Sequence, residues 1–237
     1  MSGEFKYVGS ELDLFAAVQN WKSYWSSQIR PFLHGDVLEV GAGLGANTPY
    51  MHHGGTGRWV CLEPDTQLAN QLAATVSKVN GSGEFEVLCG TLQAIEGRQF
   101  DTIVYIDVLE HIENDRKELE TAARLLRVGG RIIVLVPAHQ RLFTPFDAAI
   151  GHFRRYDRPM LRSISPAGVR LEKIWYLDSA GLLLSGANRL LLKQSMPTKG
   201  QLHVWDSFVI PASRVLDKVT FGRLGKSIVA VWCRDAG

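Results

Sequence analysis

Hydrophobic positions follow two spacings along this chain. Short, almost continuously apolar runs alternate with longer segments in which apolar residues recur every three or four positions. The runs predict buried β-strands, and the longer segments predict helices that each bury one face. The predicted strands cover residues 37–40, 59–63, 85–89, 102–106 and 131–136, and the predicted helices follow Gly45 and cover residues 66–79 and 115–126. This alternation predicts a mostly parallel sheet with helices on both faces.

The two ends of the chain complete this sheet. Residues 11–33 predict an aromatic-rich helical lead-in, and residues 169–177 and 227–234 predict two late strands, the last one antiparallel. The pair Gly129-Gly130 is typical of a helix C-terminus and is expected to end the helix at 115–126. We therefore expect a single α/β domain, 1–237, built on a doubly wound, mostly parallel seven-stranded sheet. Its parts are a lead-in or lid (1–34), a core (35–177), a cap insertion (178–226) and a final strand (227–237).

Composition narrows the classes of partner and site. The 237 residues include 26 basic and 24 acidic side chains, and a net charge of +2 does not indicate a nucleic-acid-binding protein. The three cysteines, Cys61, Cys89 and Cys233, are far apart within apolar runs, so we expect reduced thiols and neither a metal site nor a disulfide framework. The chain opens without a secretion signal, and its longest apolar segment, 180–192, is shorter than the ~20 residues of a membrane span. We expect a cytoplasmic protein.

The segment VLEVGAGLGANT carries the clearest chemical signal. Glu39 is followed by Gly41, Gly43 and Gly45, which allow the positive φ angles of a tight turn and the close approach of a nucleotide. Glu63 ends the second strand, where a carboxylate suits the ribose hydroxyls of either NAD or S-adenosylmethionine (SAM). A negative charge at Glu39 favours SAM, because SAM carries an ammonium and a sulfonium, whereas the charge would repel the pyrophosphate of NAD.

Three further segments belong to the same pattern. CLEPD surrounds Glu63, FDTIVYIDVLEHI carries Asp107 at the end of the fourth strand, and LLRVGG precedes the fifth strand, RIIVLVPAH. In this order they resemble the successive motifs of the class I SAM-dependent methyltransferases, over residues 35–137. The later segments VPAHQRLFTPFD and GHFRRYD are similar to a bacterial subgroup, which implies a small-molecule acceptor.

The resemblance implies SAM as methyl donor and a set of positions that bind it. Glu39 and the glycines would support the methionine part, Glu63 would hold the ribose, Pro64 would flank the adenine, and Asp107 would line the methyl side. The third strand departs from many relatives, because Cys89-Gly90-Thr91-Leu92 contains no acid; a backbone group or the Thr91 hydroxyl is then expected to bind the adenine. The full set is Glu39, Gly41, Ala42, Gly43, Gly45, Glu63, Pro64, Thr91, Leu92 and Asp107.

Methyl transfer requires a base only when the acceptor atom is protonated. The candidates are His111, His139 and His152. His111 is best placed, because doubly wound sheets bind ligands at the carboxyl ends of their strands. An equally open alternative is that Glu110 and His111 merely begin the following helix, with a backbone carbonyl bound to the imidazole.

The segment GHFRRYD is dense in hydrogen-bond donors and aromatic rings. Arg154 and Arg155 would bind an anionic acceptor, with Tyr156 beside them. In the alternative interpretation the segment begins a helix, and the two arginines pair with Asp147 and Asp157.

Two segments leave a choice between core and ligand contact. Trp21 and Trp25 either close over the ligands, with Trp25 at the acceptor, or only hold the lead-in against the sheet. The apolar face at 180–192 either belongs to the core or binds an apolar or lipid-linked acceptor at a membrane surface.

We expect transfer of a methyl group to a small molecule, most readily to an oxygen, because histidines cluster where a base would help. The alternatives are N- or C-methylation of a natural product or lipid-linked substrate, a non-catalytic SAM-binding scaffold and, last, an NAD-dependent oxidoreductase.

Overall fold

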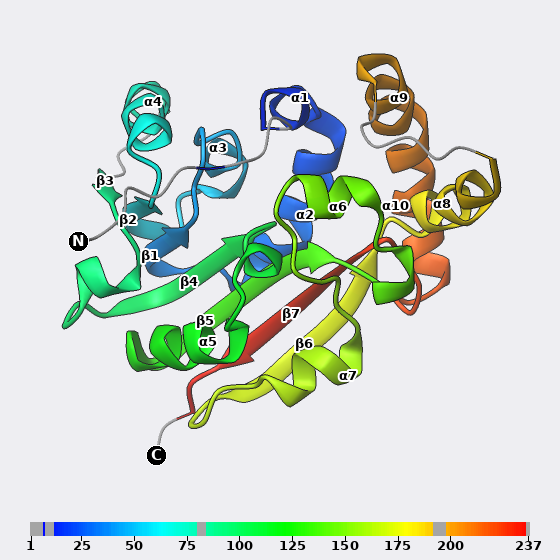
Figure 1. Cartoon of the computed structure of the whole chain (residues 1–237). Helices are drawn as coiled ribbons and strands as arrows, with labels where there is room; N and C mark the ends of the chain where they lie inside the picture. Colours follow the sequence, from blue (N-terminus) through cyan, green and yellow to red (C-terminus); the bar gives the residue numbers. More distant parts are fainter. Residues whose placement is uncertain (1–6, 8–11, 80–83, 192–197, 236–237) are drawn as a thin grey trace.

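The strands form one sheet. The computed structural model describes residues 7, 12–79, 84–191 and 198–235. Within them, seven strands pair in the order β3-β2-β1-β4-β5-β7-β6 (Figure 1), which confirms the predicted sheet. The strands are β1 (Gly35–Val40), β2 (Thr56–Glu63), β3 (Phe85–Cys89), β4 (Phe100–Ile106), β5 (Leu126–Pro137), β6 (Arg170–Leu177) and β7 (Ser227–Cys233).

Strand β7 alone runs against the rest of the sheet. β1 pairs in parallel with β2 and β4, β2 with β3, and β4 with β5. β7 pairs antiparallel with both β5 and β6. Since the chain moves outward from β1 to β3 and then returns to β4 on the other side of β1, the gap between β1 and β4 is the topological switch point at which such sheets bind ligands.

Helices cover both faces and bury a hydrophobic core on each. In one core Leu119 of α5 and Leu161 of α7 pack on the sheet, and in the other Trp25 of α2 and Leu72 of α4 do so. Figure 1 shows α5 and α7 in front of the sheet and α2 behind it. The helices are α1 (Leu12–Ala16), α2 (Gln19–Ile29), α3 (Thr48–Met51), α4 (Thr66–Val76), α5 (Asp115–Arg124), α6 (Pro145–Ala149), α7 (Arg158–Ser163), α8 (Ser179–Leu191), α9 (Lys199–Val204) and α10 (Ile210–Val219), with the short turns η1 (Arg30–Phe32), η2 (Leu92–Ile95), η3 (Leu109–His111), η4 (Gln140–Leu142) and η5 (Trp205–Val209).

The predicted glycine stop after the helix at 115–126 is wrong. α5 already ends at Arg124, and Gly129 and Gly130 lie inside β5. Gly129 has a φ of 79°, and its N–H donates to the carbonyl of Arg234 at 2.7 Å. The glycines therefore allow the long strand to bend where it meets the end of β7.

The lead-in and the cap form one unit, although they lie at opposite ends of the sequence. The carboxylate of Asp206 in η5 accepts the N–H groups of Gln19 and Asn20, both at 3.1 Å, and of Trp21 at 2.8 Å. These are the free N–H groups of the first turn of α2, whose N-cap residue, Val18, provides no side-chain acceptor. The cap thus supplies the N-cap of the lead-in helix.

A second buried carboxylate strengthens the same contact. Asp217 of α10 accepts the Tyr24 hydroxyl of α2 at 2.7 Å. It also accepts the N–H groups of Asp178 and Ser179, at 2.8 and 2.9 Å, where β6 passes into α8. One side chain therefore joins the lead-in, the end of the sheet and two cap helices.

None of the described helices combines the length and the hydrophobicity needed to cross a membrane. Within the predicted apolar segment 180–192, residue 192 and the side chains of 186–191 lie outside the described residues. Of the part that is described, Leu183 and Leu184 are exposed. The apolar face of α8 is therefore not wholly part of the core.

Candidate functional site

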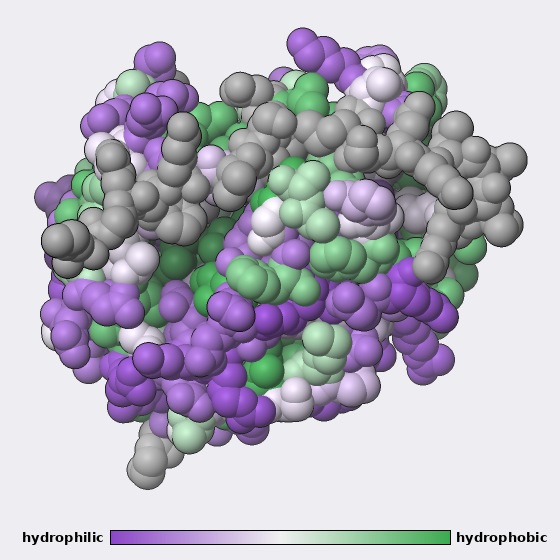
Figure 2. All heavy atoms as spheres, in the orientation of Figure 1, coloured by the Kyte–Doolittle hydropathy of each residue, from purple (hydrophilic) through white to green (hydrophobic). Residues whose placement is uncertain are grey.

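A cavity of about 1350 Å³ opens at the carboxyl ends of the parallel strands. Its lining runs from the turn after β1, past the ends of β2 and β4, to α6 and the cap, and the lead-in forms a further wall. It lies at the switch point between β1 and β4. In the orientation of Figure 1, Figure 2 shows hydrophobic surface near the centre of the molecule, beside α6, above a hydrophilic band.

The glycine turn presents bare backbone to this cavity. Gly41, Gly43 and Gly45 have φ angles of 65°, 56° and 74°. A Cβ at Gly41 would lie 2.8 Å from Val108, and one at Gly45 would lie 2.7 Å from Leu72, whereas at Gly43 no atom would be closer than 4.0 Å. Gly41 and Gly43 line the cavity, as Ala42 does, and Gly45 does not. Gly45 therefore serves the packing of the turn on α4.

Glu63 connects the end of β2 to the turn. Its Oε2 accepts the N–H of Gly43 at 2.8 Å, and its Oε1 accepts the N–H of Asp65 at 2.9 Å. The side chain is buried at the cavity wall, and burial raises its pKa against the opposing effect of these two hydrogen bonds. Pro64 and Thr91 also line the cavity, whereas Leu92 is buried and does not.

Glu39 does not lie where the sequence predicted it, beside the ligand. It does not line the cavity, because on β1 it points into the core on the α2 side. There its Oε2 accepts the Thr48 hydroxyl at 2.8 Å and the Trp59 ring N–H at 2.9 Å, and burial raises its pKa to about 7. The carboxylate thus supports the turn from below, and the argument from its charge against NAD no longer holds.

Asp107 follows β4 in an uncommon backbone conformation. Its φ is 54°, in the left-handed region that residues other than glycine rarely adopt. The N–H of Asp107 donates to the carbonyl of Leu135 at 2.8 Å, and the side chain is exposed to the cavity. Asp107 thus lies at the end of β4 and at the cavity, and its contact with the ligand stays a prediction.

Glu110, His111 and His152 come together on the cavity wall. Glu110 and His111 lie in η3 and His152 follows α6; the two imidazole rings are 4.6 Å apart, edge to face. Glu110 is completely buried, and burial together with the negative charge of Asp107 raises its pKa well above the usual range. Burial and the neighbouring His152 lower the pKa of His111 to about 4, so His111 is neutral at pH 7.

Asp147 and Arg155 hold His152 in place. The Nδ1 atom of His152 lies 3.0 Å from Asp147 Oδ1, and Arg155 donates two hydrogen bonds to the same carboxylate at 2.8 and 2.9 Å. Burial would raise the pKa of Asp147, but the hydrogen bonds from His152 and Arg155 outweigh it and lower this pKa well below its usual range. Arg155 lines the cavity, yet its charge is already paired, as the alternative interpretation of GHFRRYD expected.

Arg154 and Tyr156 are not placed at the cavity. Arg154 forms an ion pair with Asp115 at 2.7 Å, and the hydroxyl of the fully buried Tyr156 donates to the same carboxylate at 2.9 Å. Neither residue lines the cavity. Asp157, the predicted partner of the arginines, instead accepts the N–H of Met160 as the N-cap of α7. The alternation of GHFRRYD along a bent segment turns Arg154 and Tyr156 to one side and Arg155 to the other.

His139 also lies away from the cavity. Its Nε2 is 3.0 Å from the carbonyl oxygen of Gly225, and its ring stacks on Tyr176 with centroids 5.1 Å apart. These contacts bind the β5 exit to the chain before β7, so the structure gives His139 a packing position.

The lead-in forms the roof of the cavity. Trp21 and Trp25 line it and are also buried in the core between α2 and the sheet, so the packing contact is present and the contact with the ligands stays a prediction. Lys22, between them, also lines the cavity, and its Nζ donates to the carbonyl of Ala16 at 2.8 Å. Burial lowers its pKa to about 8, although Asp206 opposes this shift. The segment NWKSYW, in which a lysine stands among aromatic residues, was the signal for this position.

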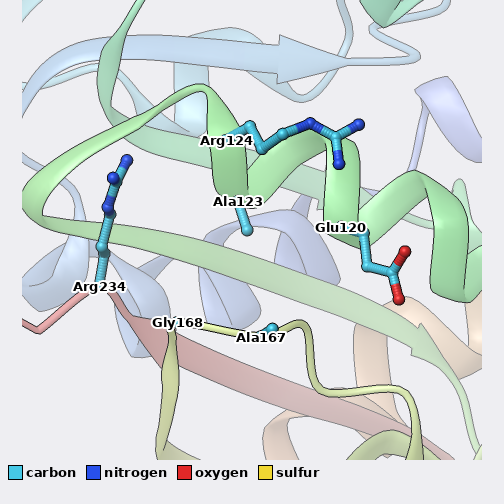
Figure 3. Close-up of a pocket in the computed structure, with 6 residues that line it drawn as sticks. All are labelled: Glu120, Ala123, Arg124, Ala167, Gly168 and Arg234. Carbon is cyan, nitrogen blue, oxygen red and sulfur yellow. The ribbon is translucent and has the colours of Figure 1, made fainter.

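A smaller hollow of about 300 Å³ lies at the other end of the sheet (Figure 3). Its lining comes from α5, the loop before β6 and the residue after β7, at the amino ends of the parallel strands. In Figure 3 the side chains of Glu120, Arg124 and Arg234 point in different directions and do not converge on a common centre. It is a poor candidate for a binding site.

Comparison with known proteins agrees with this geometry. Residues 38–134 match the model of a methyltransferase domain family, and they include the glycine turn, Glu63, Asp107 and the Glu110–His111 pair. The family match over these residues and the order of the strands together identify a Rossmann-like methyltransferase fold.

Relatives of this methyltransferase fold cover the chain to different extents. The chloroplastic tocopherol O-methyltransferase of Arabidopsis thaliana is 29% identical over 109 residues, which are 45% of this chain and 31% of that protein. The chain thus spans about a third of this curated relative. Two solved structures, of a geranyl diphosphate methyltransferase in complex with SAM and of a cyclase, each have a TM-score of 0.63 and 13% identity. The first match covers 98% of this chain and 93% of the other, and the second covers 91% and 81%. At these identities the likeness is one of fold.

Within the methyltransferase fold, sequence reasoning missed the most unusual side chain of the site. The sequence presents Glu110 as the neighbour of His111, whereas in the structure Glu110 is the one of the pair that is completely buried at the cavity. Its place in the pattern Asp-x-x-Glu-His, directly after a buried strand, was the available signal.

Proposed function

We propose that this protein transfers the methyl group of SAM to a small-molecule acceptor and that the accepting atom is an oxygen. The observation that carries the proposal is that one cavity joins the glycine turn and Glu63 with the cluster of Glu110, His111 and His152. The glycine turn and Glu63 suit a ligand with a ribose diol. The carboxyl group and the two imidazoles of the cluster favour loss of a hydroxyl proton on their side of the cavity.

In this reaction a lone pair of the acceptor oxygen attacks the methyl carbon in line with the C–S bond. The new C–O bond forms as the C–S bond breaks, and the electron pair of that bond stays on sulfur, so S-adenosylhomocysteine leaves. The hydroxyl proton passes to a water molecule on the side of the Glu110–His111–His152 cluster. Because the sulfonium is an activated donor, positioning of the two ligands supplies much of the acceleration.

The donor is proposed to bind along the turn. Gly41, Ala42 and Gly43 would lie against the methionine part, and Glu63 would exchange its contact with the turn for the ribose hydroxyls. Thr91 or a neighbouring backbone group would bind the adenine, and Asp107 would face the methyl side. Exposure of these groups to the cavity supports this order.

The acceptor is proposed to occupy the part of the cavity that faces the cap. The cavity exceeds the ~300–1,000 Å³ of a typical ligand site, which leaves room for a second molecule. Phe146, Leu184 and Trp205 line this part, so an acceptor with an apolar portion fits it. An O-methyltransferase among the relatives supports oxygen as the accepting atom.

Two other functions are weighed against this proposal. The order of the motifs and the match to a methyltransferase family argue against an NAD-dependent oxidoreductase. The charge of Glu39 does not contribute to this argument, because Glu39 is buried away from the cavity. A SAM-binding protein that does not transfer the methyl group stays open, because a cyclase has the same fold.

Thermal unfolding with and without ligands tests the donor. We expect SAM and S-adenosylhomocysteine to raise the melting temperature and NAD(H) to leave it unchanged, because a ligand that binds only the native state stabilises it by mass action. Stabilisation by NAD(H) alone would overturn the proposal. Release of S-adenosylhomocysteine in a screen of hydroxyl-bearing acceptors is expected, and its absence with every acceptor, despite tight SAM binding, would favour the non-catalytic alternative.

A further inference from the structure

The carboxylate of Glu110 is buried without a hydrogen-bond donor. Its exposed fraction is 0%, and among the described residues no hydrogen bond reaches either Oε1 or Oε2. An unpaired buried carboxylate is costly, since ionised groups in protein interiors are normally paired or bound to a metal. Glu110 is one of the residues that line the cavity, so a group bound between it and its neighbours there can satisfy these oxygens.

Two imidazoles complete a set of donors around this carboxylate. One ligand atom from each of Glu110, His111 and His152 lies within 4.8 Å of the other two. His152 Nε2 is 3.8 Å from Glu110 Oε1, which is too long for a hydrogen bond. Two ligand atoms bound to one metal ion at about 2.1 Å are about 3.4 Å apart at the tetrahedral angle and at most about 4.2 Å apart. The 3.8 Å separation therefore fits two ligands of a common ion.

The hydrogen bonds behind the cluster orient His152 as a ligand. Its Nδ1 lies 3.0 Å from Asp147 Oδ1, and because a carboxylate only accepts, Nδ1 carries the hydrogen. Neutral imidazole then has its lone pair on Nε2, the atom that faces Glu110. Asp147 is itself fixed by Arg155 and by the hydroxyl and N–H of Thr144, at 2.8 and 2.7 Å. A carboxylate behind a histidine is the usual support of a metal-binding imidazole.

We propose that Glu110, His111 and His152 bind a divalent transition-metal ion of the Zn²⁺, Co²⁺ or Mn²⁺ class, with an open coordination position toward the cavity. One carboxylate and two imidazoles form a donor set suited to these ions, whereas Mg²⁺ prefers oxygen ligands. None of the three cysteines takes part in this proposed site. The expectation that the cysteines form no metal site is therefore not affected by it.

The role of the ion rests on the proposed function, whereas its binding does not. An ion at this wall would attract the acceptor oxygen and make its hydroxyl more acidic, so that the proton leaves to a water molecule in the cavity. The acceptor oxygen would then lie near Asp107, which precedes Glu110 by three residues and lines the same cavity.

Direct titration of the metal-free protein tests the site without SAM or acceptor. After removal of metals with a chelator, we expect one equivalent of Co²⁺ per chain, visible by its d–d absorption, and displacement of Co²⁺ by Zn²⁺. Glu110→Gln keeps the shape and removes the charge; we expect it to weaken Co²⁺ binding by more than the ~10–100-fold that loss of an outer support costs. Asp147→Asn is expected to fall within that range.

His139→Asn provides the matched control, because His139 lies on the same end of the sheet but outside the cavity. We expect it to bind Co²⁺ as the unchanged protein does. Thermal unfolding without metal shows whether each variant is folded, and Glu110→Gln is expected to melt no lower than the original.

Three results would overturn the site: no stoichiometric Co²⁺ or Zn²⁺ in the folded protein, equal binding in Glu110→Gln, or binding of Mg²⁺ alone. Each leaves the proposed methyl transfer intact, because that is measured by SAM binding and turnover. Conversely, a protein that binds Co²⁺ through Glu110 but never turns over SAM keeps the metal site and loses the proposed function.

Discussion

Different kinds of groups form the donor half and the acceptor half of the cavity. The donor half consists of a backbone turn with positive φ angles and one carboxylate, Glu63, bound to main-chain N–H groups. The acceptor half consists of buried charges that hold one another, with Arg155 on Asp147 and Asp147 on His152. The backbone geometry of the turn follows from its local sequence. The stability of a set of buried charges, in contrast, requires that every member of the set is present. We therefore expect mutations in the donor half to affect binding and mutations in the acceptor half to affect folding.

Arg155→Met should give the largest effect. It leaves Asp147 buried without its cation, and breaking a buried pair in this way costs about 3–5 kcal/mol of stability. Arg154→Met is the matched control, because the Asp115 carboxylate is less buried than Asp147 and keeps the hydrogen bond from Tyr156, so the cost should be smaller. Urea unfolding of both variants measures the difference, and equal costs would contradict the contrast between the halves.

Glu39→Gln tests a buried carboxyl group beside the donor half. The pKa of Glu39 is raised to about 7, above the ordinary 4.5, so the folded protein keeps a proton that the unfolded chain loses. This contribution to stability is complete below about pH 4.5 and is lost as the pH rises to 7. The variant lacks this loss, so relative to the original protein it should gain up to about 3 kcal/mol between pH 4.5 and 7. Parallel pH profiles in denaturant unfolding would show that Glu39 has an ordinary pKa.

Glu63→Ala should weaken SAM binding by about 100-fold, because two hydrogen bonds from the ribose to a charged group are lost. Calorimetry measures the affinity. Glu39→Gln serves here as the control, since Glu39 lies one strand away and outside the cavity, and it should keep its SAM affinity. A comparable loss of SAM affinity in both variants would show that Glu39 also contributes to SAM binding.

Two glycine substitutions should give the smallest effects and separate packing from binding. Gly45→Ala places a Cβ 2.7 Å from Leu72 at a positive φ and should cost about 2–3 kcal/mol of stability. Gly43→Ala has the same backbone strain of about 1 kcal/mol but no close neighbour, and its methyl group should lower SAM affinity instead. Thermal unfolding measures the stability of both variants, and calorimetry measures their SAM affinity. A loss of affinity in Gly45→Ala alone would contradict the assignment of Gly45 to packing and of Gly43 to binding.

The contrast between the halves also explains what could be predicted from the sequence. Strands appear as local apolar runs, and the turn and Glu63 appear as local motifs, so the sheet and the donor half were predicted close to their observed positions. Local periodicity does not reveal on which side of a strand or bend a polar residue lies. For that reason Glu39, Tyr156 and Arg154 were expected at ligands and are found in contacts of the interior.

Long-range partners were beyond prediction for a related reason. The charges of GHFRRYD were recognised, but the choice of Asp115 for Arg154 and Asp147 for Arg155 depends on how η3, α5 and α6 meet in space. Glu110 was overlooked because a missing partner becomes visible only when every neighbour is known. The same holds for Gly129, whose bend is explained by a contact with Arg234 at the far end of the chain.

The bond from Asp206 to the start of α2 has a consequence for the order in which the protein is made. A ribosome synthesises the lead-in first, and the three N–H groups of Gln19, Asn20 and Trp21 then lack their native acceptor until residue 206 has emerged. By that time all but the last strand of the sheet has been translated. The roof over the donor half is thus completed late in synthesis, and an incomplete chain presents its nucleotide turn without the helix that covers it.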